Sequence, residues 1–210
     1  MNIGIIGSGN VGGALGARWA QAGHAVAFAS RDTNSPDIQQ LVSKAGSSAR
    51  AATVPDAAAF GGVLLLATPW PAAREALQSA GDLAGKVLLD ATNPLLPNLE
   101  GLDVGTTTSG GEQVAVWARG AKVVKIFNTV GFNIMADPRF GENRAVMFYC
   151  GDDSAAKKTA AQLAAELGFE PLDAGPLTQA RLLEPVALLW ITLANFYGYS
   201  RDIAFELLRR

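Results

Sequence analysis

Residues 2–31 read NIGIIGSGNVGGALGARWAQAGHAVAFASR, and this stretch decides the fold of the chain. An apolar run, Ile3 to Ile6, meets the glycine-rich segment at residues 7–12. A helical stretch follows to about residue 22, and a second apolar run covers residues 25–29. The order strand, glycine turn, helix, strand predicts a unit that binds a dinucleotide.

Each glycine of the turn has a physical role. Gly7 permits the tight turn out of the strand, Gly9 lets a pyrophosphate approach the backbone, and Gly12 lets helix and strand pack closely. An ordinary βα turn accounts for one of these glycines, or two, but not for three at this spacing. The start of the helix adds unpaired N–H groups and the positive end of the helix dipole. We therefore predict cofactor contacts at Gly7, Ser8, Gly9, Asn10, Val11 and Gly12.

The end of the second strand indicates which dinucleotide binds. NAD sites place an acid there for the ribose 2′-hydroxyl, but this strand ends in Ser30 and Arg31. A guanidinium and a hydroxyl can hold a 2′-phosphate through charge-assisted hydrogen bonds, which favours NADP(H). Arg31 as a solvated surface residue is the alternative. Asp32 follows at once and could serve an NAD ribose if the strand ran further.

The composition narrows the class of protein. The chain has 210 residues, 49% of them hydrophobic and 17% charged, with a net charge of −2 and no basic run, which argues against a nucleic-acid partner. Cys150 and His24 are the only residues of their types, so a disulfide within the chain and a metal site are not expected. We expect no membrane span and no secretory signal, and therefore a cytoplasmic protein, because the longest apolar stretch, residues 185–197, is short.

Apolar runs and helical stretches alternate along the rest of the chain. We expect strands at residues 3–6, 25–29, 51–54, 63–67, 87–90, 122–127, 145–149 and 169–173, and helices at 10–22, 36–46, 72–80, 111–118, 154–167 and 179–196, with a short helix at the C-terminus. This alternation predicts an α/β fold with a doubly wound, mostly parallel (Rossmann) sheet and a small C-terminal α/β extension. Ligands bind such sheets beyond the carboxyl ends of the strands.

Three further strand ends should therefore reach the cleft. They are Thr68-Pro69-Trp70, Asn93, and the segment from Asn128 to Gly131. Trp70 is expected either to wall the nicotinamide side or to cover the next helix. Asn128 is expected either to hydrogen-bond the nicotinamide carboxamide or to serve a turn. The predicted cofactor-binding set therefore also includes Ser30, Arg31, Thr68, Pro69, Trp70, Asn93 and Asn128.

We expect two domains. Residues 1–144 form the NADP-binding domain, and residues 145–210 form a smaller unit that completes the acceptor site, a homodimer interface, or both. In that unit Ser154 is the expected N-cap of a helix. Arg181 and Glu184, three residues apart, predict a local ion pair, with a catalytic acid as the alternative.

Several segments together resemble a known family. Besides residues 7–32, they are ATPW at 67–70, DATNP at 90–94, KIFNTVGFNIMADP at 125–138, CGDD at 150–153 and LDAGPLTQARLLEP at 172–185. These segments resemble the NADPH-dependent deazaflavin (coenzyme F420) oxidoreductases and the related reductase domain of the transmembrane metalloreductases. The resemblance implies pyrophosphate contacts at residues 8–11, a 2′-phosphate site at Ser30 and Arg31, and a nicotinamide near residues 68–70. The chain has Asn128 near the place where the archaeal members have a histidine.

The resemblance implies an enzyme that moves a hydride between NADP(H) and a bound small-molecule acceptor, foremost coenzyme F420. Another flavin, a metal chelate, a carbonyl or an imine stays open as the acceptor, as does a non-catalytic NADP(H) sensor. Hydride transfer to a deazaflavin needs little acid–base chemistry from the protein. No residue is therefore assigned as catalytic.

Overall fold

Strands and helices alternate along most of the chain, as the sequence predicts. The computed structural model describes residues 1–210. Its strands are β1 (Asn2–Ile6), β2 (Ala25–Ala29), β3 (Ala49–Ala52), β4 (Val63–Leu66), β5 (Val87–Asp90), β6 (Lys122–Ile126), β7 (Arg139–Phe140), β8 (Asn143–Arg144), β9 (Val146–Gly151) and β10 (Glu170–Asp173). Its helices are α1 (Asn10–Gln21), α2 (Pro36–Ala45), α3 (Val54–Phe60), α4 (Trp70–Ser79), α5 (Gly110–Trp117), α6 (Phe132–Ala136), α7 (Ser154–Glu166) and α8 (Ala180–Phe196).

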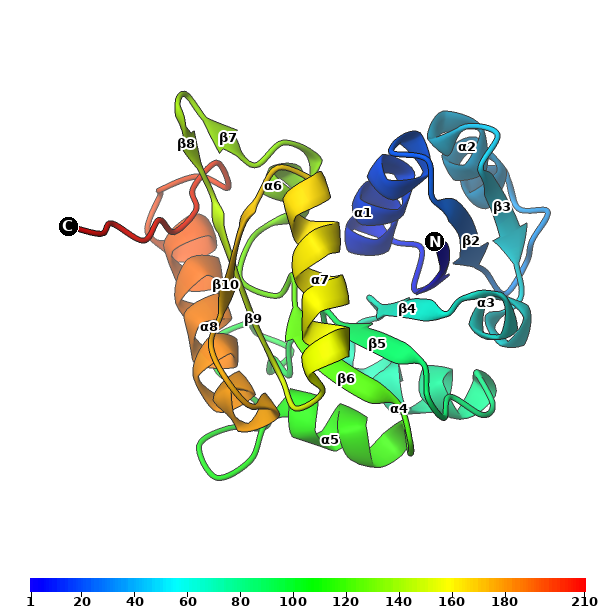
Figure 1. The fold of residues 1–210 in the computed structure, drawn as a ribbon. Helices are drawn as coiled ribbons and strands as arrows, with labels where there is room; N and C mark the ends of the chain where they lie inside the picture. The colour runs from blue at the N-terminus through cyan, green and yellow to red at the C-terminus, as the bar shows by residue number, and fades with distance from the viewer.

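Eight strands form one sheet in the order β10-β9-β6-β5-β4-β1-β2-β3 (Figure 1). All neighbouring strands are parallel except β6 and β9, which run antiparallel. The order 3-2-1-4-5-6 is that of the doubly wound dinucleotide-binding sheet, which confirms the predicted fold class. The strand order reverses between β1 and β4, so the crevice for a ligand lies beyond the carboxyl ends of these two strands.

The C-terminal third of the chain adds two strands to the same sheet. Lys125 of β6 pairs with Cys150 of β9, and β10 then pairs with β9 in parallel. The hairpin of β7 and β8 stands apart from this sheet. Residues 145–210 thus continue the sheet of the N-terminal part, and their treatment as a separate domain stays a prediction.

The sheet has a hydrophobic core on each face. Alternate residues of β4 point to opposite faces, so Leu65 joins one core while Leu64 and Leu66 join the other. Helices α1, α2 and α7 cover the first face, and α3, α4, α5 and α8 cover the second. Small residues let α1 approach the sheet, because a Cβ at Gly16 would meet the ring of Phe28.

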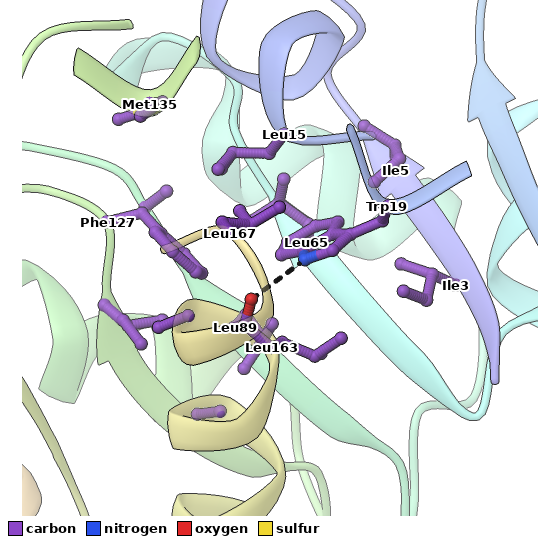
Figure 2. Close-up of a cluster of buried hydrophobic side chains, with 14 of the residues drawn as sticks. Ile3, Ile5, Leu15, Trp19, Leu65, Leu89, Phe127, Met135, Leu163 and Leu167 are labelled. Atoms are coloured by element: carbon purple, nitrogen blue, oxygen red, sulfur yellow. Dashed lines mark hydrogen bonds between the residues drawn. The ribbon is translucent and has the colours of Figure 1, made fainter. Parts of the chain in front are cut away.

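Trp19 joins the helices of the first face (Figure 2). Its ring is fully buried and stands edge-on to Phe127 at a centroid distance of 5.7 Å. Its Nε1–H donates to the carbonyl oxygen of Leu163 on α7, at 3.2 Å. This one side chain therefore couples the glycine-turn helix to the C-terminal part of the chain, with its polar atom satisfied.

Side-chain caps at two helix starts differ from the prediction. Strand β3 ends at Ala52, because Thr53 caps the unpredicted helix α3 by accepting from the Asp56 N–H at 3.3 Å. Helix α7 is capped by Asp153 and not by Ser154, since the Asp153 carboxylate accepts from the Ala156 N–H at 2.8 Å. In both cases a side chain three residues before the bonded amide fixes the helix start.

The predicted short C-terminal helix is absent, and residues 197–210 contain no helix or strand. Gly198 and Ser200 have φ of 75° and 62°, which ends the helical path after α8. The tail instead binds the body of the protein through its carbonyl oxygens. Ile203 accepts from the Trp190 indole N–H at 2.7 Å, and Phe205 accepts from the Val146 N–H at 3.0 Å. In this tail, hydrogen bonds to distant residues therefore take the place of the local hydrogen bonds of a helix.

Candidate functional site

The geometry of the glycine turn fits a phosphate. Gly7 has φ of 104°, and a Cβ there would meet the backbone of Ala67 and Thr68 at 2.6–2.7 Å. A Cβ at Gly12 would meet the carbonyl oxygen of Gly7, so this glycine allows the close packing of helix and strand. At Gly9 nothing lies within 4 Å of a Cβ position, which leaves the backbone open to a ligand.

The start of α1 offers its N–H groups to that open space. Gly9 is the N-cap residue, no side chain caps the helix, and no acid lies in the first turn. The helix has 12 residues, so its dipole favours an anion at this end. The hydroxyl of Ser8 donates to the Ala29 carbonyl at 2.9 Å and ties the turn to the end of β2.

Three cavities adjoin the glycine turn. The β2 cavity has about 600 Å³ and is lined by Gly7, Ser8, Ser30, Arg31 and Glu75 among others. The Trp70 cavity has about 620 Å³ and is lined by Gly9, Asn10, Val11, Trp70, Asn93 and Leu96 among others. Thr68 and Pro69 line both of these cavities. The α1–α2 groove has about 850 Å³ and is lined by Asn10, Arg18, Leu41, Lys44 and Phe132 among others.

These cavities bring together the predicted cofactor residues except Gly12 and Asn128. Gly12 lies beneath the turn, against Gly7 and Ile5. Ligand contact by any of the predicted residues stays a prediction.

In the β2 cavity, Arg31 is exposed and makes no hydrogen bond or ion pair with the protein. Strand β2 ends at Ala29, and the Ser30 hydroxyl donates to the Asp32 carbonyl at 2.8 Å. The Asp32 carboxylate accepts from the Asn34 N–H at 2.9 Å, and Asp32 lines none of the three cavities. At the end of β2 the cavity therefore presents a cation and a hydroxyl, and its one acid, Glu75, comes from α4 and not from the strand end where an NAD site places an acid.

The Trp70 cavity is mainly apolar. Trp70 begins α4, packs on Trp117 at a centroid distance of 5.1 Å, and donates its indole N–H to Asp103 at 3.1 Å. Leu95, Leu96, Pro97 and Leu99 from the irregular segment after β5 complete the wall. The Thr68 hydroxyl oxygen is buried and has no hydrogen-bond partner in the protein. An apolar wall of this kind suits a planar ring.

Segment 128–131 lies behind this wall. Asn128 is buried, and its side-chain amide donates to Asn93 Oδ1 and to the Leu183 carbonyl, both at 3.2 Å. Its backbone carbonyl accepts from the Asn93 side-chain amide at 2.9 Å. A Cβ at Gly131 would meet the Trp190 ring of α8 at 2.6 Å. The expectation that this segment contacts the cofactor stays a prediction. The segment lines none of the three cavities and reaches the Trp70 cavity through Asn93.

A buried charge cluster stands beside Asn93, and sequence reasoning missed it. The Lys125 ammonium lies 2.9 Å from both the Asp90 and the Glu184 carboxylates, and all three side chains are at most 1% exposed. Burial disfavours the charged amine, but the two carboxylates outweigh it and raise the pKa of Lys125. Lys125 within the apolar strand run and Glu184 within an apolar helix were the available signals.

The predicted local ion pair between Arg181 and Glu184 is wrong. Arg181 instead pairs with Glu112 of α5 at 2.6 Å, and Glu184 turns inward to Lys125. Both contacts depend on how α8 packs over α5. The three-residue spacing of Arg181 and Glu184 does not predict that packing.

The remaining nucleophile and base candidates serve the structure. Cys150 is fully buried, and burial raises the pKa of its thiol to about 12, so the reactive thiolate is not formed near neutral pH. His24, just before β2, lies 2.7 Å from Glu166 of α7 and 3.1 Å from the N-terminal amine of Met1. Neither residue lines the three cavities.

The strand order and the glycine turn define a protein of the Rossmann-type, dinucleotide-binding class. A family model described as NADP oxidoreductase, coenzyme F420-dependent, matches residues 2–94. The F420-dependent NADP reductase of Methanothermobacter thermautotrophicus is 32% identical over 92% of this chain and 89% of its own length. The chain therefore belongs to the family of coenzyme F420-dependent NADP oxidoreductases, which are NADP-dependent enzymes.

Other relatives match to different extents. A crystal structure of a candidate F420-dependent NADP-reductase from Arthrobacter sp. FB24 has 32% identity and a TM-score of 0.89 over the whole of both chains. The metalloreductase STEAP3 of Rattus norvegicus is 32% identical over 89% of this chain, which spans 36% of that protein. A reductive aminase from Aspergillus terreus, at 24% identity and a TM-score of 0.69, shares the fold. None of the helices of this chain combines the length and the apolar composition that a membrane crossing requires.

Proposed function

We propose that this protein transfers a hydride between NADP(H) and coenzyme F420, with the deazaflavin ring held in the Trp70 cavity. The observation that supports this most strongly is the apolar Trp70 cavity, which shares Gly9 and Asn10 with the phosphate-binding turn. The relative from Methanothermobacter thermautotrophicus carries the same activity in its name.

The residues that would hold the cofactor follow from the cavities. Gly9 and the start of α1 take the pyrophosphate, and Ser30 and Arg31 take the 2′-phosphate in the β2 cavity. Thr68, Trp70 and Asn93 then surround the nicotinamide half in the Trp70 cavity.

The contribution of the protein to the reaction is positioning and exclusion of water. When bound, NADPH supplies the hydride, and a deazaflavin can accept it directly. Trp70, Leu95 and Leu96 provide apolar walls that keep water from the reacting faces. Asp103 is the one titratable side chain that lines the Trp70 cavity, and it accepts a hydrogen bond from Trp70, so the chain contributes orientation rather than proton transfer.

A panel of acceptors tests this function. NADPH oxidation is measured with coenzyme F420, FAD, FMN, a ferric chelate, a carbonyl compound and an imine in parallel. We expect turnover with F420 well above that with any other acceptor. Turnover with another acceptor alone would assign a different reductase, and NADPH binding without any turnover would assign a sensor.

We further propose that α8 forms a homodimer interface. Leu182 and Leu189 are 62% and 50% exposed on this helix, and Phe196 and Tyr197 follow at its end, 52% and 70% exposed. Large apolar side chains gathered on one helix indicate an interaction surface. Leu189→Asp should convert a dimer to a monomer in light scattering, and a wild-type protein that is already monomeric contradicts this proposal. A cytoplasmic location stays a prediction.

A further inference from the structure

The buried charge cluster fixes a turn of the cavity wall. Lys125 donates to the Thr92 carbonyl at 2.6 Å and to Asp90 Oδ2 at 2.9 Å. Asp90 Oδ1 accepts from the Thr92 N–H at 2.9 Å and from its hydroxyl at 2.7 Å. The carbonyl, amide and hydroxyl of Thr92 are thus all bound by Lys125 and Asp90. Thr92 lines the Trp70 cavity together with Ala91 and Asn93.

The cluster is anchored from behind by two helices. Glu184 of α8 bonds Lys125 and accepts from the Gly110 and Gly111 N–H groups at the start of α5, both at 2.9 Å. The positive end of the α5 dipole offsets part of the second carboxylate charge. Every charged group of the cluster therefore has partners, which makes a buried cluster rigid.

The same geometry sets the direction of Asn93. The Asn93 side-chain amide donates to the backbone carbonyl of Asn128 and accepts from the Asn128 side-chain amide, which also donates to the carbonyl of Leu183, next to Glu184. The wall of the Trp70 cavity is therefore connected to α8 at two adjacent residues. Loss of a charged group from the cluster should therefore shift the positions of Thr92 and Asn93 and leave the residues that line the β2 cavity in place.

We propose that Lys125, held by Asp90 and Glu184, is a positioning residue that fixes the turn of residues 91–93 and thereby orients the nicotinamide half of the cofactor. This inference rests on the proposed place of the nicotinamide in the Trp70 cavity. It concerns a residue that contacts no ligand.

The test compares NADPH with adenosine 2′,5′-bisphosphate, which carries only the adenosine and 2′-phosphate half. The variant Lys125→Met/Glu184→Gln removes the hydrogen bond to the Thr92 carbonyl and the lysine that anchors Asp90, while the two bonds from Thr92 to Asp90 keep their partners. The formal charge of the cluster is unchanged. The control variant Arg181→Gln removes another link between α8 and α5 that does not reach the turn. Calorimetry gives both affinities, and hydrogen exchange reports the Thr92 amide.

We expect the double variant to bind NADPH about three- to tenfold more weakly, the range for one lost hydrogen bond, with the affinity for the bisphosphate unchanged. The Thr92 amide should exchange faster, and Arg181→Gln should change neither quantity. If the double variant does not fold, Glu184→Gln alone should shift the same ratio in the same direction by less.

The proposal would be overturned if the double variant lost affinity for NADPH and for the bisphosphate equally. It would also be overturned if the ratio of the two affinities stayed at its wild-type value in the double variant, as in Arg181→Gln. Neither measurement uses an acceptor. A protein that shows the expected ratio but reduces no F420 would refute the proposed function and leave this inference standing.

Discussion

Arg31 extends from the end of β2 into the β2 cavity without a protein partner. A guanidinium in this place is available to a 2′-phosphate, which NADPH has and NADH lacks. We expect Arg31→Ala to weaken NADPH binding about ten- to hundredfold, as for one charged hydrogen bond, and to leave NADH nearly unchanged. Fluorescence titration with both cofactors measures this.

The control for Arg31 is its neighbour Asp32. Its carboxylate is bound to the Asn34 amide, so Asp32→Asn should alter neither cofactor affinity strongly. A large loss of NADH binding in Asp32→Asn, with no effect of Arg31→Ala on NADPH, would reverse the assignment of the cofactor.

Two glycines of the same turn separate stability from binding. A Cβ at Gly12 would meet the Gly7 carbonyl, so we expect Gly12→Ala to cost about 1–3 kcal/mol of stability through overpacking. Gly9 has open space at its Cβ position, so Gly9→Ala should fold with normal stability and bind NADPH more weakly. Denaturant unfolding and titration measure the two effects. Equal unfolding midpoints for Gly12→Ala and Gly9→Ala would contradict the prediction that only Gly12 is needed for stability.

At the scale of elements, α5 and α8 are joined by an ion pair at their surface. Hydrogen bonds from Arg181 hold the pKa of Glu112 below its usual range. A carboxylate with a lowered pKa in the folded state stabilises the fold above its ordinary pKa. That contribution is lost as the pH falls through the lowered value.

We therefore expect Glu112→Gln to lower stability at pH 7, with a difference from wild type that narrows below about pH 4.3, the ordinary glutamate pKa. Urea unfolding of both proteins at pH 7 and pH 3 measures the difference. A gap of the same size at both pH values would show that the pair does not act through the charge of Glu112.

The elements that the sequence predicts well are those whose signals are local. The glycine turn, the buried strands and the helix periodicities depend on residues close in sequence, and β1, α1, β2 and β4 match their predicted positions within one residue at each end. The cap at Asp153 was missed because Asp153 and Ser154 are adjacent and can each begin a helix, and backbone geometry chooses between them. The helix α3 was missed because its cap Thr53 and first residue Val54 were assigned to the preceding strand.

Non-local contacts explain the other errors. Arg181 and Glu184 lie on one helix yet bind Glu112 and Lys125 on other elements. The tail after α8 bonds Trp190 and β9 instead of coiling. The positions of the predicted cofactor residues around one turn followed from strand ends. The contacts of the buried residues behind the cavity wall depend on how α8 packs, and no local sequence pattern predicts that packing.

At the scale of the whole molecule, three cavities meet at one glycine turn, which lies where the strand order reverses. Residues of α4 and of the segment after β5 line the Trp70 cavity. The β2 cavity suits the adenosine half of the cofactor, and the Trp70 cavity suits two stacked planar rings. In the proposed function this arrangement brings the hydride donor and the acceptor together in one cavity. The central claim is therefore direct transfer of a hydride within the Trp70 cavity.

Deuterium transfer tests that claim most directly. The protein is mixed with coenzyme F420 and NADPH that carries deuterium stereospecifically at nicotinamide C4, once for each face, and the reduced deazaflavin is analysed by mass spectrometry and NMR. Direct transfer predicts that deuterium from one of the two labelled cofactors appears on the reduced deazaflavin ring. Reduced F420 that carries only solvent hydrogen with both cofactors, or no reduction of F420 at all, would contradict it.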